Sequence, residues 1–299
     1  MILQTIKQIS CLLCLCCFLQ QSAFSQDDKD KPAYTLFDNT GKQISYGELI
    51  KRLSGYDVIF LGELHNCPIT HWLEFEITRS IYNIHKDQLM LGAEMFESDN
   101  QLIFDEYMQQ KISYDRFEAE ARLWDNYRTD YYPVVFFAKE HHIPFIATNI
   151  PRRYANIVKN KGFEALDSLS EEAKRYIAPL PIDFEYDEAQ SAAAFSMMNM
   201  IGGRRAGDNR KLAQAQAIKD ATMGWFIARN IKNKFLHING SYHSNRQGGI
   251  IPYLLRYRPN TSIVTVTSVR QESIRKLDDD HKGLADFYIC VPEDMVNSY

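Results

Sequence analysis

Two short motifs of the form Gly-x-x-His contain residues that could carry out acid–base or metal chemistry. Gly62-Glu63-Leu64-His65 follows the apolar run 58–61, and Gly240-Ser241-Tyr242-His243 follows the apolar run 235–238. In an open parallel sheet, ligands bind beyond the carboxyl ends of the strands, which is where each motif places its histidine. The two motifs therefore predict one composite site at the edge of a sheet.

Carboxylates follow another predicted strand, residues 88–93. Glu94 comes directly after this strand, and Glu97 follows three residues later. A buried carboxylate that faces an imidazole costs free energy unless the two groups are paired or bind a metal. The candidate catalytic residues are therefore Glu63, His65, Glu94 and His243.

The segment Asn149-Ile150-Pro151-Arg152 follows the predicted strand 144–148 and has the residues of a helix start. Asparagine suits the N-cap and proline suits the first helical turn. The free backbone N–H groups, together with Arg152, could bind a carboxylate or a phosphate. The same residues fit a plain helix start with Arg152 in a salt bridge, so both interpretations stay open.

Strand-like and helical segments alternate along residues 34–299, which predicts an α/β domain with a mainly parallel sheet flanked by helices. The predicted strands are 57–62, 88–93, 144–148, 234–239, 262–269 and 286–291. Apolar residues at helical spacing predict helices through 69–81 and 212–226. The alternation stops between about 161 and 208, where we predict a helical insertion or cap.

Composition excludes several classes of partner. The chain has 299 residues, of which 45% are hydrophobic, so it can bury one sizeable core. With 34 basic and 38 acidic residues, its net charge of −4 provides no bulk attraction to nucleic acid or to an anionic membrane. We therefore expect no nucleic-acid partner.

The first residues have the pattern of an export signal peptide, residues 1–25. Lys7 precedes the apolar stretch 9–19, and Ala23-Phe24-Ser25 provides small residues at the cleavage position. Cleavage there would leave a polar leader, residues 26–33, ahead of the domain. We expect an exported protein of the periplasm or cell envelope.

The cysteines indicate neither a disulfide framework nor a lipid anchor. Cys67 and Cys290 are the two that lie outside the predicted signal peptide, and a single bridge between them stays open. Cys11 comes before most of the apolar stretch, where lipid attachment would leave no hydrophobic region in the signal. We therefore expect no lipid anchor.

The chain lacks the sequence motifs of the commonest α/β enzymes. It contains no His-Glu-x-x-His zinc motif, phosphate-binding loop, dinucleotide glycine fingerprint or Gly-x-Ser-x-Gly nucleophile elbow. Taken together, however, several segments resemble the ChaN-like family of haem-binding uptake proteins, in the broader group that contains Tiki, TraB and the erythromycin esterases. The matching segments, in the same order and at similar spacing, are 58–65, 92–97, 143–152, 209–223 and 236–243.

This resemblance implies an exported, iron-regulated haem-binding protein with an α/β fold and a helical subdomain. At least one member binds stacked haems between two subunits with tyrosine on the iron. The resemblance therefore implies haem as cofactor, a homodimer, and an outer-membrane haem transport system as a partner.

Under this resemblance, Tyr186 is the first candidate for the iron ligand, with Tyr131 and Tyr242 in reserve. A tyrosinate suits ferric haem because a hard anionic oxygen stabilises the oxidised metal. The Ala- and Met-rich run 192–201 could cover a porphyrin face. Further candidates for contacts with haem, including its propionates, are Asn149, Arg152, Arg204, Arg205 and Arg210.

The wider group implies an alternative hypothesis, a metal-dependent hydrolase or peptidase. Tiki-like members are described as metal-dependent peptidases, and the esterases use His and Glu to activate water. In this alternative, His65, Glu94 and His243 hold a divalent ion or activate water directly, and Glu63 is the general base. A third hypothesis treats these residues as structural remnants in a pure binding protein.

Overall fold

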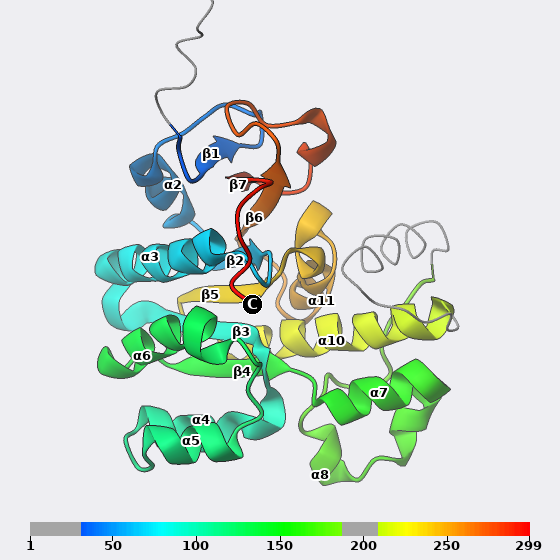
Figure 1. Cartoon of the computed structure of the whole chain (residues 1–299). Coiled ribbons are helices and arrows are strands. Elements are labelled where there is room, and N and C mark those ends of the chain that lie inside the picture. The colour runs from blue at the N-terminus through cyan, green and yellow to red at the C-terminus, as the bar shows by residue number, and fades with distance from the viewer. Residues whose placement is uncertain (1–30, 187–208) are drawn as a thin grey trace, which may run out of the picture. The chain divides into compact units, whose positions relative to one another are not determined.

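In the computed structural model, which describes residues 31–186 and 209–299, seven strands form one sheet (Figure 1). The strand order is β1-β7-β6-β2-β5-β3-β4, and each neighbouring pair is parallel except β1 with β7. The strands are β1 (Thr35–Asp38), β2 (Val58–Glu63), β3 (Leu89–Glu97), β4 (Phe145–Asn149), β5 (Lys234–Gly240), β6 (Ile263–Gln271) and β7 (Phe287–Pro292).

The predicted fold class, a mainly parallel sheet flanked by helices, is confirmed, and all six predicted strands are present. Strand β1 is not among the predicted strands. This strand has only four residues, and it pairs antiparallel with β7, where Thr35 lies opposite Cys290. A pairing between segments so far apart in the chain leaves no local pattern to find. Cys67 and Cys290 are both buried and free, so the open disulfide alternative does not form.

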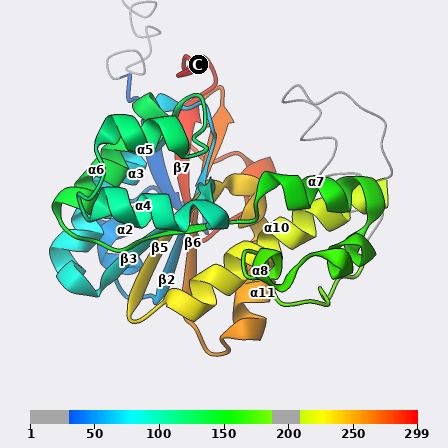
Figure 2. The same cartoon turned by 90° about the horizontal axis from the view of Figure 1, so that it is seen from below.

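Helices cover both faces of the sheet (Figures 1 and 2). In the described residues they are α2 (Tyr46–Leu53), α3 (Pro68–His85), α4 (Gln101–Met108), α5 (Tyr114–Glu120), α6 (Tyr132–Glu140), α7 (Arg152–Lys161), α8 (Glu171–Lys174), α10 (Asn209–Asn230) and α11 (Ile250–Tyr257). Within this part of the chain, no helix combines the length and apolarity that a bilayer crossing needs. The predicted signal peptide lies outside the described residues, as do Arg204, Arg205 and the Met-rich run 192–201.

The pleat of the sheet separates two hydrophobic clusters. Ile59 and Leu61 of β2 pack with α2 to α6 on what we call the α3 face. Val58 and Phe60 pack with α10 and α11 on the opposite side, the α10 face. Successive side chains of a strand point to opposite faces, so the next odd-numbered residue, Glu63, points to the α3 face.

Helices α10 and α11 approach closely at Gly224 of α10. A Cβ atom at this position would lie 2.9 Å from the backbone nitrogen of Leu254 and 3.0 Å from Cβ of Tyr253. Both distances are shorter than ordinary contacts, and a backbone atom cannot move aside as the end of a side chain can. The absence of a side chain at residue 224 therefore sets how closely the two helices pack.

We predict that Gly224→Ala destabilises the protein although alanine is the better helix former. Overpacking should lower the free energy of unfolding by about 1–3 kcal/mol, measured by urea denaturation. Gly47→Ala is the matched control, because a Cβ at this helical position of α2 meets no atom within 4 Å. The control should gain up to about 1 kcal/mol. Equal stability of Gly224→Ala and the wild type would contradict the close approach.

Candidate functional site

The two Gly-x-x-His motifs follow neighbouring parallel strands. Glu63 at the end of β2 lies opposite Gly240 at the end of β5. Glu94 lies on β3, which borders β5 on its other side. The structure therefore brings the four predicted catalytic residues to the carboxyl ends of three adjacent strands, β2, β5 and β3. We call this region the rim.

On the α10 face of the rim, His243 lies between two carboxylates. Its Nε2 atom is 3.3 Å from Oε1 of Glu94, and its Nδ1 atom is 2.5 Å from Oδ1 of Asp220 on α10. The backbone N–H of Gly240 donates to Oε2 of Glu94 at 2.8 Å. His243, Glu94 and Asp220 are all buried, so their charges are stable only in combination.

The pKa values at this triad indicate an imidazolium between carboxylates. Burial alone would lower the pKa of His243, but Glu94 and Asp220 raise it to about 10. Burial likewise opposes the charge on Glu94, yet His243 holds the pKa of this carboxyl well below its usual range. Burial raises the pKa of Asp220. The contact of His243 with Asp220 therefore links α10 to the rim.

On the α3 face of the rim, Glu63 binds a histidine and a tyrosine. Its Oε1 atom is 2.5 Å from Nδ1 of His65 and accepts a hydrogen bond of 2.8 Å from the hydroxyl of Tyr131. Burial and the nearby carboxylate of Glu74 raise the pKa of Glu63 to about 8. Burial opposes the charge on His65, but the hydrogen bond with Glu63 raises the pKa of this imidazole.

His65 connects the two halves of the rim. A Cβ atom at Gly240 would lie 2.8 Å from Nε2 of His65 and 3.4 Å from Oε2 of Glu94. Residue 240 must therefore lack a side chain for the imidazole to lie there. Of the four predicted catalytic side chains, that of His65 is 38% exposed, whereas those of Glu63, Glu94 and His243 are at most 6% exposed. A ligand at the rim would meet His65 first.

Of the residues predicted to bind an anion after β4, Asn149 makes local structural contacts. The side-chain amide of Asn149 donates to the backbone carbonyl of Glu94 at 2.8 Å, and its Oδ1 accepts from the N–H of Ile150 at 2.9 Å. Helix α7 begins at Arg152 with Pro151 in the N-cap position, so Asn149 is not the cap. Arg152 is exposed. An anion site there stays a prediction.

Glu97, the second carboxylate after the predicted strand 88–93, does not join the rim network. Its carboxylate accepts a hydrogen bond of 2.9 Å from Nε of Arg122. Arg122 therefore neutralises the charge of Glu97 at the end of β3, just before the segment that leads to α4.

The three candidate haem tyrosines lie in different surroundings. Tyr131 is buried against Glu63, and burial raises the pKa of its phenol far above the usual range. Tyr242 is 36% exposed, and partial burial together with the nearby Asp220 carboxylate raises its pKa to about 12. Tyr186 is half-buried, with the guanidinium of Arg210 5.9 Å from the centre of its ring.

Three buried acids at the site are not among the predicted site residues: Glu74, Asp130 and Asp220. His71 and Glu74 are three residues apart on α3, a spacing that places both side chains on one helix face. That spacing could have identified the pair. Asp220 has no comparable signal, because only the packing of α10 against the rim brings it to His243.

The potential metal ligands differ from the predicted set. Ligand atoms of Glu63, His71 and Glu74 all lie within 4.8 Å of one another, the one such group of three among the described residues. A divalent ion held by His65, Glu94 and His243 stays a prediction.

Comparison with known proteins places the chain in a family. The family model of haem-binding uptake proteins of the Tiki superfamily, ChaN, matches residues 49–254. The chain belongs to this family. The resemblance that the ordered motifs predict is therefore confirmed. The comparison with curated proteins gives no match.

Solved structures share the fold of this ChaN-family chain. ChaN of Campylobacter jejuni, described by its cofacial haem binding, has a TM-score of 0.67 and 20% identity, over 88% of this chain and 97% of that one. A protein from Bacillus cereus has a TM-score of 0.50 and 11% identity, over 87% of this chain and 95% of that one. The ChaN-like α/β fold is thus established.

We predict that His243→Gln destabilises the protein, because it leaves Asp220 and Glu94 buried without a cation. The free energy of unfolding should fall by about 3–5 kcal/mol near neutral pH. The pKa of His243 is about 10 in the folded protein and 6.5 ordinarily. The stabilisation that the His243 cation provides is therefore complete below pH 6.5 and is lost as the pH rises through about 10.

The measurement is urea denaturation of wild type and variant across this pH range, with His142→Gln at an exposed position as the control. The difference between wild type and His243→Gln should shrink toward high pH. A loss below about 1 kcal/mol, the range of a surface ion pair, would show that His243 is not a buried cation.

Proposed function

We propose that this protein binds ferric haem in the cell envelope and serves haem or iron acquisition. The observation that carries the proposal is the family match over residues 49–254, which covers most of the domain. The signal-peptide pattern of residues 1–25 supports export. Two copies of the chain would hold the haems face to face, by analogy with the cofacial binding in ChaN of Campylobacter jejuni, and an outer-membrane haem transport system would be the partner.

We further propose that Tyr186 is the iron ligand. A ligand oxygen must be free to reach the iron and to ionise, and the hydroxyl of Tyr131 meets neither need because it is buried on Glu63. Tyr242 is more accessible but has a raised pKa. Tyr186 is half-buried, and within the described residues its ring lies 5.9 Å from the guanidinium of Arg210, a cation available to an anionic ligand at this place.

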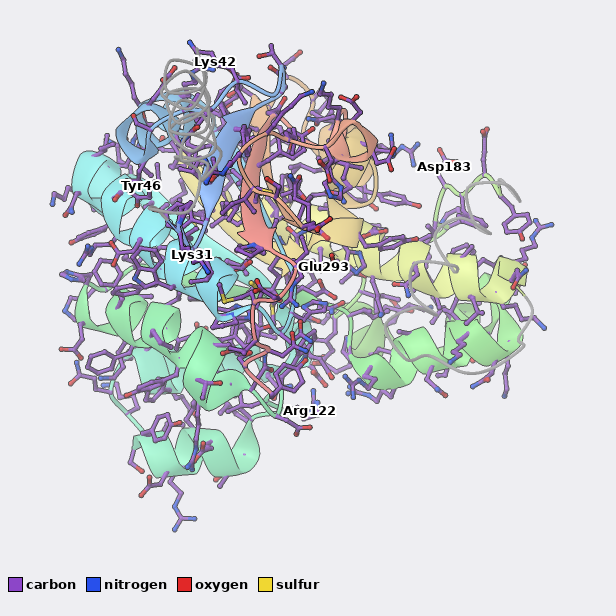
Figure 3. All side chains as sticks on the ribbon, turned by 45° about the horizontal axis from the view of Figure 1, so that its top comes forward. Lys31, Lys42, Tyr46, Arg122, Asp183 and Glu293 are labelled. Carbon is purple, nitrogen blue, oxygen red and sulfur yellow. The ribbon has the colours of Figure 1, made fainter. Side chains whose placement is uncertain are left out.

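The segment that carries Tyr186 is anchored to the body of the domain. The hydroxyl of Tyr253 donates to the backbone carbonyl of Asp183 at 3.1 Å, and Arg256 pairs with the Asp183 carboxylate at 2.7 Å. Figure 3 shows Asp183 on the side of α10 and α11. The ring of Phe184 packs on Phe163 at 5.5 Å. These contacts would hold Tyr186 in position for a flat ligand.

Titration of the purified mature protein with hemin tests the ligand. Wild type should give a saturable tyrosinate-type absorbance change, and Tyr186→Phe should raise the Kd by at least about tenfold, or about 1.4 kcal/mol. Tyr56→Phe, at an exposed residue after α2, is the control and should bind as wild type does. Equal Kd values for wild type and Tyr186→Phe would contradict the assignment, and a loss in Tyr242→Phe instead would move the ligand to the rim.

One observation favours a second function, a hydrolase at the rim. The imidazole of His65 is partly exposed and is held by the buried carboxylate of Glu63, close to Glu94. In this arrangement His65 would take a proton from a water molecule while the Glu63 carboxylate orients its ring. The geometry supports activation of water with or without a divalent ion.

If the rim is catalytic, His65→Gln should reduce hydrolysis of ester or peptide substrates by about 10²–10⁴-fold, the usual contribution of an acid–base residue. The assay compares wild type, His65→Gln and the His142→Gln control, each with and without added Mn²⁺ or Zn²⁺. No hydrolysis above background by wild type, or equal rates for all three proteins, would eliminate the hydrolase.

A further inference from the structure

A second polar cluster lies behind His65, on the α3 face of the rim. His71 and Glu74 of α3 face Glu63 of β2, and the side chains of all three are at most 4% exposed. Nδ1 of His71 is 3.0 Å from Oε2 of Glu74 and 3.6 Å from Oε2 of Glu63. One imidazole nitrogen thus faces two carboxylates in a space closed to solvent.

The tautomer of His71 is set by the contacts of its other nitrogen. Nε2 lies 3.2 Å from the backbone carbonyl oxygen of His65 and 3.4 Å from Oδ2 of Asp130. A carbonyl oxygen can only accept a hydrogen bond, so Nε2 carries a proton. In the neutral imidazole, Nδ1 then presents its lone pair to Glu63 and Glu74. Metal-binding histidines usually have this arrangement, with the far nitrogen donating to a carbonyl or carboxylate.

Asp130 is itself fixed in place. The side-chain amide of Asn126 and the hydroxyl of Ser298 each donate to its Oδ2 atom at 2.7 Å. The partner of His71 Nε2 is therefore held independently of the cluster, as a supporting residue of a metal site should be.

Two carboxylate oxygens in this cluster lack hydrogen-bond partners. Oε2 of Glu63, which faces His71, and Oε1 of Glu74 are both buried, and within the described part of the chain neither has a donor. Buried polar atoms are nearly always satisfied, so each such atom needs an explanation. Two carboxylates and a nitrogen lone pair are all acceptors, and only protons or a cation can satisfy them together.

We propose that Glu63, His71 and Glu74 bind one divalent first-row transition-metal ion in a buried site, separate from the haem. One nitrogen and two oxygen ligands suit several such metals. Two ligands of a tetrahedral zinc ion, each about 2.0–2.1 Å from the metal, are roughly 3.3 Å apart. The separations of 3.0 and 3.6 Å from His71 Nδ1 to the two carboxylates bracket this value.

The ion would also affect the rim, because Glu63 is part of both the buried cluster and the rim. Its Oε2 atom faces the cluster, and its Oε1 atom binds His65 and Tyr131. A bound cation keeps Glu63 ionised and fixes its plane, and the carboxylate then orients the imidazole of His65. The buried ion is thus a structural ion that positions His65.

The test measures metal content and affinity of the full chain without haem. After dialysis against chelator and reconstitution, wild type should hold about one equivalent of Zn²⁺ or Mn²⁺, and chelator should lower its Tm. Glu74→Gln keeps the shape of the side chain but should weaken Zn²⁺ binding in calorimetry by about tenfold or more, as loss of a metal-site residue does. Glu76→Gln, on the same helix and paired with Arg79, is the matched control.

Several outcomes would overturn the proposal. These are wild type without stoichiometric metal, unchanged affinity in Glu74→Gln, and loss of the ion in His243→Gln but not in Glu74→Gln. If Glu74→Gln does not fold, zinc-edge X-ray absorption of the wild type with bound Zn²⁺ gives the number of imidazole ligands and so distinguishes the two candidate metal sites. One imidazole is expected for this cluster, whereas the rim trio of His65, Glu94 and His243 would give two. The result does not depend on haem, so it can fail while the proposed function stands.

Discussion

The pleat of the parallel sheet decides where the rim carboxylates point. Side chains alternate between the two faces along each strand, so Glu63 of β2 lies with α3 whereas Glu94 of β3 lies toward α10 and Asp220. Each carboxylate is therefore paired on its own face. His65, which passes over Gly240, connects the two halves.

Burial then determines what each half must contain. An isolated ion in a protein interior costs several kcal/mol, so each buried carboxylate needs a counter-charge or a proton beside it. On the α10 face, Asp220 and Glu94 hold His243 as a cation. On the α3 face, Glu63 and Glu74 outnumber His71, and that excess of acceptors is the physical basis for the metal ion that we propose there.

Local sequence patterns were enough to predict the six longer strands and the rim. A buried parallel strand followed by glycine and polar residues is recognisable within about ten residues. Local patterns could not predict the site role of Asp220 or the strand β1, because both depend on contacts with segments far away in the chain. Tyr131 shows the same difficulty. The family resemblance makes it a reserve candidate for the iron ligand, and only the fold reveals that its hydroxyl donates to Glu63. The His71 and Glu74 pair was within reach of the sequence, through its helical spacing.

We thus propose two sites in one protein. One is the charged rim at the strand ends, and the other is Tyr186 on the segment that Asp183 anchors to α11. Iron anomalous scattering from crystals of the protein with hemin would test this division most directly. The account predicts an iron peak within bonding distance of the Tyr186 hydroxyl oxygen. An iron peak at His65 or His243 would contradict it and would place haem at the rim.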